Sequence, residues 1–486
     1  MSDQVGAAEV AKKRLGTGAV IGLVLAIGVV AGIGGTWIRG TDSDSGPTYP
    51  SAWDPRVASL AAYVEEHRGL KFKHPVYVEF LSDAEFVKQV TDDGSDLSAA
   101  DKQDLTNEQS MLRGLGLISG GTDLLKATNA LQGSGVIGLY NNDDKKIRVR
   151  GDQLTPSVRV TLVHEMTHAL QDQYFDLAAT FKRLDDDKNA DSSAFHAIVE
   201  GDATRVQDGY EASLSASDRA AIAKQDTKDA ARFQSGVSHV PQIMQALFSA
   251  PYPLGEFAVQ TALVKGGNAA VDALFPNPPT TDRPILDPSL IDAPAAPTSI
   301  PDLALGAGET EVDRGIFGTV PLFLMMSRNS AYWASAFLAG ADISDRYVQY
   351  TKGSTTCVRA EFEAADAGTA KGLHNGLLLW AQGAHTGATV TQAGTITTIN
   401  SCDPGPSYVS SADHSSDALS VLMTRNAIYA GVRRDGAPAG FSICYADGVV
   451  EHYSAADLER LNADNVTAAD KAELQKLGVA CRGSNP

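Results

Sequence analysis

Residues 163–173 read VHEMTHALQDQ, and this stretch decides how the rest of the chain is interpreted. Thr155 followed by Pro156 is typical of a helix start, with an N-cap residue and then proline at the first helical position. Apolar residues then recur at helical spacing as far as Tyr174, which predicts one long helix with a buried stripe. On a different face this helix gathers four polar residues, namely His164, Glu165, His168 and Asp172.

The spacing H-E-x-x-H predicts a zinc site. Residues four apart on a helix are neighbours, so the imidazoles of His164 and His168 can converge on one metal ion. Glu165 between them can then act on the metal-bound water as a general base. The alternative interpretation is a pair of surface histidines on an ordinary amphipathic helix.

A catalytic zinc usually takes three protein ligands, so a third must come from elsewhere in the chain. The continuation H-x-x-G-x-x-H is absent, because ALQDQYF follows His168. Residues 193–209 predict a second helix that carries Glu200, which we favour as the third ligand. His196 is a rival because it lies four residues earlier on the same predicted face.

Two acidic residues near the ligands are candidates to orient an imidazole from behind. Asp172 lies on the same predicted face as the two histidines, whereas Asp202 points elsewhere on an ideal helix. For both, a solvated carboxylate is the alternative. Tyr252, in APYPLG, is a further candidate to donate a hydrogen bond to an oxyanion, although a buried core tyrosine is the commoner role.

VHEMTHALQDQYFDL followed by IVEGDAT resembles the gluzincin class of zinc metallopeptidases, and more narrowly a poorly characterised bacterial group with HExxHALQDQ and EGDA segments. The resemblance extends over residues 55–365 and includes GLYNNDDKKIRVRG, APYPLGEFAVQTALVKGG, NPPTTDRPIL and ISDRYVQY. It implies a zincin-like fold and peptide-bond hydrolysis. Carried over residue by residue, it implies that His164, His168 and Glu200 bind Zn²⁺ and that Glu165 is the general base.

This chain departs from the group's pattern at two places. The group has a leucine-histidine-proline triplet where this chain has Leu286-Asp287-Pro288, and it has a glycine where this chain has Ser344. Any auxiliary role of these positions is in doubt. The predicted ligands and base match the pattern without substitution.

A membrane span is predicted near the N-terminus. Residues 16–38 carry no charge and exceed the roughly 20 apolar residues that cross a bilayer. A cleaved signal peptide is the alternative, although its apolar region usually has only about 7 to 15 residues. Lys12, Lys13 and Arg14 precede the span and only Arg39 follows it closely, which predicts a cytoplasmic N-terminus and a large extracytoplasmic domain.

The cysteines agree with an oxidising location. All four lie in the last third of the chain, and no C-x-x-C spacing supports a four-cysteine zinc site. Sequence proximity favours one disulfide between Cys357 and Cys402 and another between Cys444 and Cys481. The net charge of −19 and the absence of long Lys/Arg clusters argue against nucleic-acid binding.

The overall pattern is α+β and predominantly helical. Residues 55–67 have helical spacing, residues 73–82 alternate like a strand, and residues 136–151 predict two short strands around an Asn/Asp turn. The end of the chain predicts a small disulfide-tied α+β addition. The predicted parts are a cytoplasmic N-terminus 1–15, a transmembrane helix 16–38, a linker 39–51, a zinc metallopeptidase domain 52–365 and a disulfide-containing region 366–486.

These observations favour a membrane-anchored, extracytoplasmic zinc metallopeptidase that acts on peptides or proteins. One alternative is a zinc-binding cell-envelope protein without catalysis, although Glu165 would then have no task. The other is a zinc hydrolase of peptidoglycan peptides, which the sequence does not distinguish from a protease.

Overall fold

The structure, a computed structural model, describes residues 47–483 apart from 96, 292–299, 385–386, 412 and 463–464. It contains the small sheet that was predicted before the helix with the HExxH motif. The predicted membrane span and cytoplasmic N-terminus lie outside the described residues. Among the residues that are described, no helix has the length and apolar character to span a membrane. The described chain is mostly helical α+β, with two separate sheets.

The first sheet has three strands in the order β1-β3-β2. β2 pairs antiparallel with β3 to form the predicted hairpin, and β1 pairs parallel with β3. The Asn141 side chain accepts hydrogen bonds from the N–H groups of Asp143 and Asp144, which closes the turn. All four residues of β2 are buried, because α6 packs against it. The strands are β1 (Val78–Leu81), β2 (Gly138–Asn141) and β3 (Lys146–Arg150).

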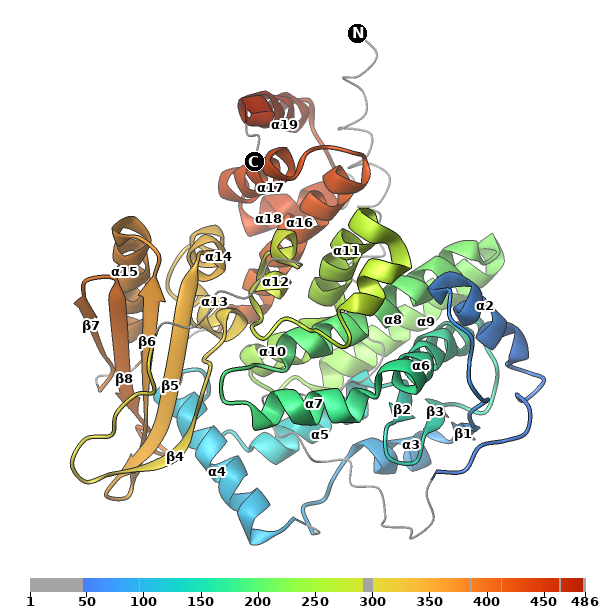
Figure 1. Cartoon of the computed structure of the whole chain (residues 1–486), viewed down its shortest axis with the longest axis horizontal. Coiled ribbons are helices and arrows are strands. Elements are labelled where there is room, and N and C mark those ends of the chain that lie inside the picture. Colours follow the sequence, from blue (N-terminus) through green and yellow to red (C-terminus); the bar gives the residue numbers. More distant parts are fainter. Residues whose placement is uncertain are drawn as a thin grey trace.

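Three long helices form the centre of the molecule (Figure 1). α6 (Pro156–Phe175) starts as predicted, with the Thr155 hydroxyl accepting a hydrogen bond from the N–H of Val158. α8 (Ser193–Ser213) packs against both α6 and α11 (Pro251–Ala273). α8 and α11 are in backbone contact, because a Cβ added to Gly255 would lie 1.8 Å from the Ala197 oxygen.

Further helices surround these three and contribute to the hydrophobic clusters of the core. After β3, helices follow one another as far as Ala273, and helices occur again between Thr319 and Gly340. These helices are α2 (Ala58–Arg68), α3 (Asp83–Val90), α4 (Ala99–Gly114), α5 (Leu124–Gly135), α7 (Leu177–Asp186), α9 (Ala216–Gly236), α10 (Gln242–Ser249), α12 (Arg283–Leu286), η1 (Pro288–Leu290), α13 (Thr319–Ser327) and α14 (Tyr332–Gly340).

The second sheet is antiparallel, with the order β4-β5-β6-β8-β7, and lies at the left of Figure 1, away from the first sheet below α6. Cys357 on β6 faces Cys402 on β8, and these two residues form a disulfide. β6 ends before residue 365 and β8 begins after it, so the two regions predicted on either side of this position share one sheet. The elements are β4 (Glu309–Gly315), β5 (Ile343–Lys352), β6 (Thr355–Ala364), α15 (Ala367–Ala384), β7 (Thr389–Ala393) and β8 (Ile396–Cys402).

The chain ends in a helical group with a small hydrophobic core of its own. A second disulfide joins Cys444 to Cys481, so both pairings match those predicted from sequence proximity. This group lies beyond α11 and α12 in Figure 1 and contacts the centre through α16. Its helices are α16 (Ser415–Arg434), α17 (Ala439–His452), α18 (Ala455–Asn462), α19 (Ala468–Ala480) and η2 (Cys481–Gly483).

Candidate metal centre

α6 and α8 bring together the three residues predicted as zinc ligands. His164, His168 and Glu200 each offer a ligand atom, and these atoms lie within 4.8 Å of one another. One carboxylate oxygen, Glu200 Oε2, is 3.2 Å from His164 Nε2 and 3.4 Å from His168 Nε2. All three residues are buried. This arrangement could hold a metal ion between two imidazoles and a carboxylate, which is a typical set of ligands for zinc.

His196, the rival third ligand, lies beside this group. Its Nε2 atom is 3.6 Å from the other oxygen of Glu200, Oε1, and no residue that the structure describes forms a hydrogen bond with it. His196 and Glu200 are one turn apart on α8, so both side chains reach the same region. Glu200 nevertheless is the residue that forms the compact group with His164 and His168.

Glu165 is held between α6 and the edge of the first sheet. Its Oε2 accepts a hydrogen bond of 2.8 Å from the N–H of Tyr140 on β2, while its Oε1 has no hydrogen-bond partner among the described residues. Gly138 makes this position possible, because a Cβ there would lie 2.7 Å from Glu165 Oε1 and 2.4 Å from Thr161 Cγ2. Glu165 is completely buried, and burial raises its pKa to about 8.

The charges of the buried centre are arranged for a cation. Burial favours the neutral form of Glu200, but the three neighbouring histidines outweigh it and hold its pKa well below the usual range. Burial lowers the pKa of His164. For His168, burial also acts to lower the pKa, but the carboxylate of Glu200 outweighs it and raises the pKa to about 9. A proton on His168 therefore supplies positive charge where a metal ion would.

Several buried polar atoms at the centre find no hydrogen-bond partner in the described part of the chain, and a bound ion would supply one. They include the Nε2 atom of His168 and the Oε1 atoms of Glu165 and Glu200. Since buried polar groups are costly when unsatisfied, a cation shared by the imidazoles and the carboxylate fits this set. The chemistry of these residues thus suits zinc.

The two acidic residues predicted to orient an imidazole do different things. Asp172 accepts hydrogen bonds from Tyr140 Oη at 2.7 Å and Lys145 Nζ at 2.6 Å, which ties the hairpin to the end of α6. Asp202 accepts from Gln171 Nε2 at 2.9 Å, and Gln171 Oε1 in turn lies 3.0 Å from His168 Nδ1. Asp202 therefore reaches an imidazole indirectly, through a residue that the sequence reading did not single out.

One feature of the sequence could have indicated the role of Gln171. It lies three residues after His168, so the two side chains are neighbours on one helix face. Nothing in the sequence showed that Asp202 would approach its amide from α8. Tyr252 lies at the start of α11, and its ring centre is 6.4 Å from that of His164.

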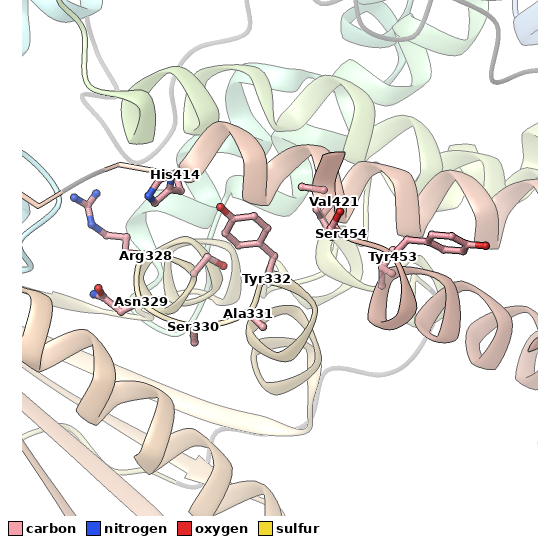
Figure 2. Close-up of a pocket in the computed structure, with 12 residues that line it drawn as sticks. Arg328, Asn329, Ser330, Ala331, Tyr332, His414, Val421, Tyr453 and Ser454 are labelled. Atoms are coloured by element: carbon pink, nitrogen blue, oxygen red, sulfur yellow. The ribbon is translucent and has the colours of Figure 1, made fainter. Parts of the chain in front are cut away.

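A cavity of about 520 Å³ lies elsewhere, between the α13–α14 junction and the C-terminal helices (Figure 2). None of the predicted site residues lines it. Several of its polar groups already have partners within the protein. The Ser330 hydroxyl donates to the Met326 carbonyl, the Ser454 hydroxyl donates to Asp457, and Arg328 donates to Ser410. Because none of the predicted site residues lines this cavity, it is separate from the metal centre.

No family model, curated protein or solved structure matches this chain. Its function is therefore inferred from the metal centre and from the motifs that form it. The resemblance to gluzincins depends on the HExxH helix and the EGDA segment, whose side chains meet in the structure at His164, His168 and Glu200.

Proposed function

We propose that this chain is a zinc metallopeptidase of gluzincin type with a zincin-like domain, anchored by the N-terminal span so that its main domain is extracytoplasmic. The observation that carries the proposal is that both imidazoles of the motif meet one oxygen of Glu200. Glu165 lies on the same helix and has one carboxylate oxygen without a hydrogen-bond partner.

His164, His168 and Glu200 would hold the zinc ion. When bound, zinc supplies a positive charge that acidifies a water molecule and polarises a substrate carbonyl group. Glu165 accepts the proton of the attacking water and passes it to the leaving amine. Burial raises the pKa of this carboxyl to about 8, so the group can hold a proton before it passes that proton to the leaving amine. The N–H of Tyr140 keeps the carboxylate oriented during this exchange.

A second candidate function is a zinc-binding envelope protein without catalysis. Its supporting observation is the burial of the centre, because His164, Glu165 and Glu200 are each 0% exposed. A structural zinc site is typically closed, whereas a catalytic one keeps a coordination position open to water. Peptidoglycan peptides remain an alternative substrate class for a catalytic site of the same chemistry.

The test is metal analysis and peptide hydrolysis with the purified full-length protein. We expect about one zinc ion per chain and hydrolysis of casein-derived peptides or of purified cell wall. Glu165→Gln should retain the zinc and lose about 10²- to 10⁴-fold in rate, because it removes the base and no ligand. Glu200→Ala should lose both zinc affinity and activity.

Glu211→Gln provides a control, since it makes the same chemical change on α8 away from the centre. It should leave zinc content and hydrolysis unchanged. A folded wild-type protein that binds no zinc would contradict the metal assignment. Stoichiometric zinc without turnover of any peptide or cell-wall substrate would instead favour the non-catalytic candidate.

A further inference from the structure

The side-chain amide of Gln171 is held in one orientation by its partners. Its Nε2 atom donates to Asp202 Oδ2 at 2.9 Å and to the Val199 carbonyl oxygen at 3.1 Å. A carbonyl oxygen can only accept hydrogen bonds, and so can an ionised carboxylate. The NH₂ group must therefore face these two oxygens, and the amide oxygen Oε1 must face His168.

This orientation decides which nitrogen of His168 carries a proton. Gln171 Oε1 lies 3.0 Å from His168 Nδ1, and an amide oxygen is only an acceptor, so Nδ1 must be the donor. In the neutral ring Nε2 is then left with a free lone pair. Nε2 is the atom that faces Glu200, at 3.4 Å from Oε2. A reversed amide would place its NH₂ against Nδ1 and leave the proton on Nε2, where it blocks metal binding.

Two buried arginines determine that Asp202 acts as the acceptor. Arg68 Nε lies 2.8 Å from Asp202 Oδ2, and Arg205 Nη2 lies 2.7 Å from Oδ1. The side chains of Asp202 and Arg68 are completely buried, and that of Arg205 is 8% exposed. Arg205 Nε donates to Oδ1 at 2.8 Å, Gln171 Nε2 donates to Oδ2, and the positive charge of Arg68 lies beside Oδ2, so both oxygens of Asp202 act as acceptors. Arg68 is also fixed by Asp272 at 2.6 Å, and it comes from α2, far from the motif in sequence.

We propose that Asp202, held by Arg68 and Arg205, selects the metal-binding tautomer of His168 through the amide of Gln171. Gln171 and Asp202 are thus positioning residues, and α2 contributes to the metal centre through Arg68. The inference rests on the proposed role of His168 as a metal ligand. It does not depend on whether the bound metal hydrolyses anything.

Asp202→Asn tests the proposal with the smallest change of shape. The side-chain NH₂ of an asparagine at this position must replace one of the two carboxylate oxygens. It then faces either the donors of Arg205 or those of Arg68 and Gln171. The second arrangement turns the Gln171 amide around and shifts the His168 proton to Nε2. We expect zinc binding to weaken by about 10- to 100-fold, as is typical when the partner behind a metal ligand is lost.

Asp229→Asn is the matched control. Asp229 is also buried, accepts from the amide of Gln225 at 3.2 Å, and pairs with Arg232 at 3.0 Å. It therefore repeats the Gln-Asp-Arg arrangement on α9 without a histidine at its end. The same substitution there should leave zinc affinity unchanged, so a general effect of losing a buried carboxylate is measured separately.

The experiment combines chelator competition for zinc with ¹⁵N–¹H spectra of the histidine side chains in the full-length protein. Wild-type His168 should carry its proton on Nδ1, both with zinc bound and in metal-free protein at alkaline pH, where the ring is neutral. Asp202→Asn should move that proton to Nε2 in the metal-free protein. Gln171→Met, which removes the oriented amide, should give a mixture of tautomers and serves as a second variant if Asp202→Asn does not fold.

The proposal is overturned if wild-type His168 is protonated on Nε2, or if folded Asp202→Asn and folded Gln171→Met both keep the wild-type tautomer and zinc affinity. Failure of the proposed peptidase function has a different signature. In that case zinc binds and the tautomer responds as expected, but the wild-type protein hydrolyses no peptide. A wild-type protein that binds no zinc would remove the metal centre itself, whereas the tautomer of the metal-free ring would still test the role of Gln171 and Asp202.

Discussion

At the scale of single residues, the position of Glu165 depends on Gly138, which has no side chain. Gly138 on β2 faces α6, and the carboxyl group of Glu165 occupies the space where a larger residue would have its Cβ. The strand can therefore approach the helix closely enough for the N–H of Tyr140 to donate to Glu165 Oε2. Backbone contact of this closeness is a common reason for glycine within a strand.

Gly138→Ala should therefore disturb the position of the general base, Glu165, more than it disturbs zinc binding. The added methyl group would lie 2.7 Å from Glu165 Oε1 and 2.4 Å from Thr161 Cγ2, so the side chain or the strand must move. We expect a loss of about 1–3 kcal/mol in stability. Hydrolysis should fall by about 100-fold, because displacement of a reacting group by about 1 Å can cost that much. Thermal unfolding and peptide hydrolysis measure these two effects, and the zinc content shows whether the metal is retained.

Gly133→Ala is the control for this substitution. Gly133 lies on α5, and a Cβ there would meet Thr91 Cγ2 at 3.4 Å, which is ordinary contact. Alanine also favours a helix over glycine, so stability should stay equal or rise. Equal rates of hydrolysis for Gly138→Ala and the wild type would show that the strand does not position Glu165.

At the scale of elements, the centre depends on how closely α8 lies against α11. Gly201 follows Glu200, the proposed ligand, directly, and a Cβ on Gly201 would be 2.1 Å from the backbone carbon of Gly255. A Cβ on Gly255 would be 1.8 Å from the carbonyl oxygen of Ala197. The two helices thus meet backbone to backbone, and α11 determines where α8 holds Glu200 relative to α6.

Gly255→Ala should force α8 and α11 apart. The clash is with backbone atoms, which have no rotamer to relieve it, so we expect a loss of about 3 kcal/mol or more in stability. Because the shift acts on the helix that carries Glu200, zinc affinity should fall as well. Chemical denaturation and chelator competition measure the two effects.

Gly431→Ala on α16 supplies the comparison, since its nearest neighbour would be Arg434 Nη2 at 3.8 Å. This variant should match the wild type in zinc affinity. If Gly255→Ala lost stability but bound zinc as tightly as Gly431→Ala, the α8–α11 contact would be structural only.

At the scale of the whole molecule, three aspartates meet where the helical centre joins the second sheet. Asp191 precedes α8, Asp282 is the N-cap of α12, and Asp345 lies on β5. Asp282 accepts from the N–H groups of Thr319 and Val320, and Asp345 accepts from the N–H of Phe317. Burial is the main cause that raises the pKa of Asp345 to about 7, and it also raises the pKa of Asp191.

This junction predicts that stability falls as pH rises from about 4 to about 7. The folded protein holds a proton on Asp345 up to a pKa of about 7, whereas the unfolded chain releases it near 3.9. The folded state therefore binds more protons in this window, so the free energy of unfolding decreases with pH by about 1.4 kcal/mol per unit for each such proton. Above about pH 7 this contribution is constant.

Asp345→Asn should remove part of that slope, because an amide does not titrate. Urea denaturation at a series of pH values between these limits measures it. Asp152→Asn, at an exposed position, should keep the wild-type slope. A slope that is the same in Asp345→Asn and the wild type would mean that the junction does not hold its protons in the folded state.

The sequence by itself determined the features that depend on local spacing. Two histidines and a glutamate within five residues predicted the metal-binding face of α6, and Thr155-Pro156 predicted where that helix starts. The short hairpin also followed from residues close together along the chain, and the disulfides followed from pairing consecutive cysteines. The predicted membrane span rests on composition and stays a prediction, because it lies outside the described residues.

Tertiary structure decided what depends on residues far apart. Only the packing of α8 on α6 shows that Glu200, with His196 beside it, completes the group with His164 and His168. Only the fold brings Arg68 from α2 to Asp202. It also places strands from both sides of residue 365 in one sheet. The physical reason is that helical periodicity fixes neighbours within one turn, whereas contacts between elements depend on which surfaces pack and on glycines that let backbones touch.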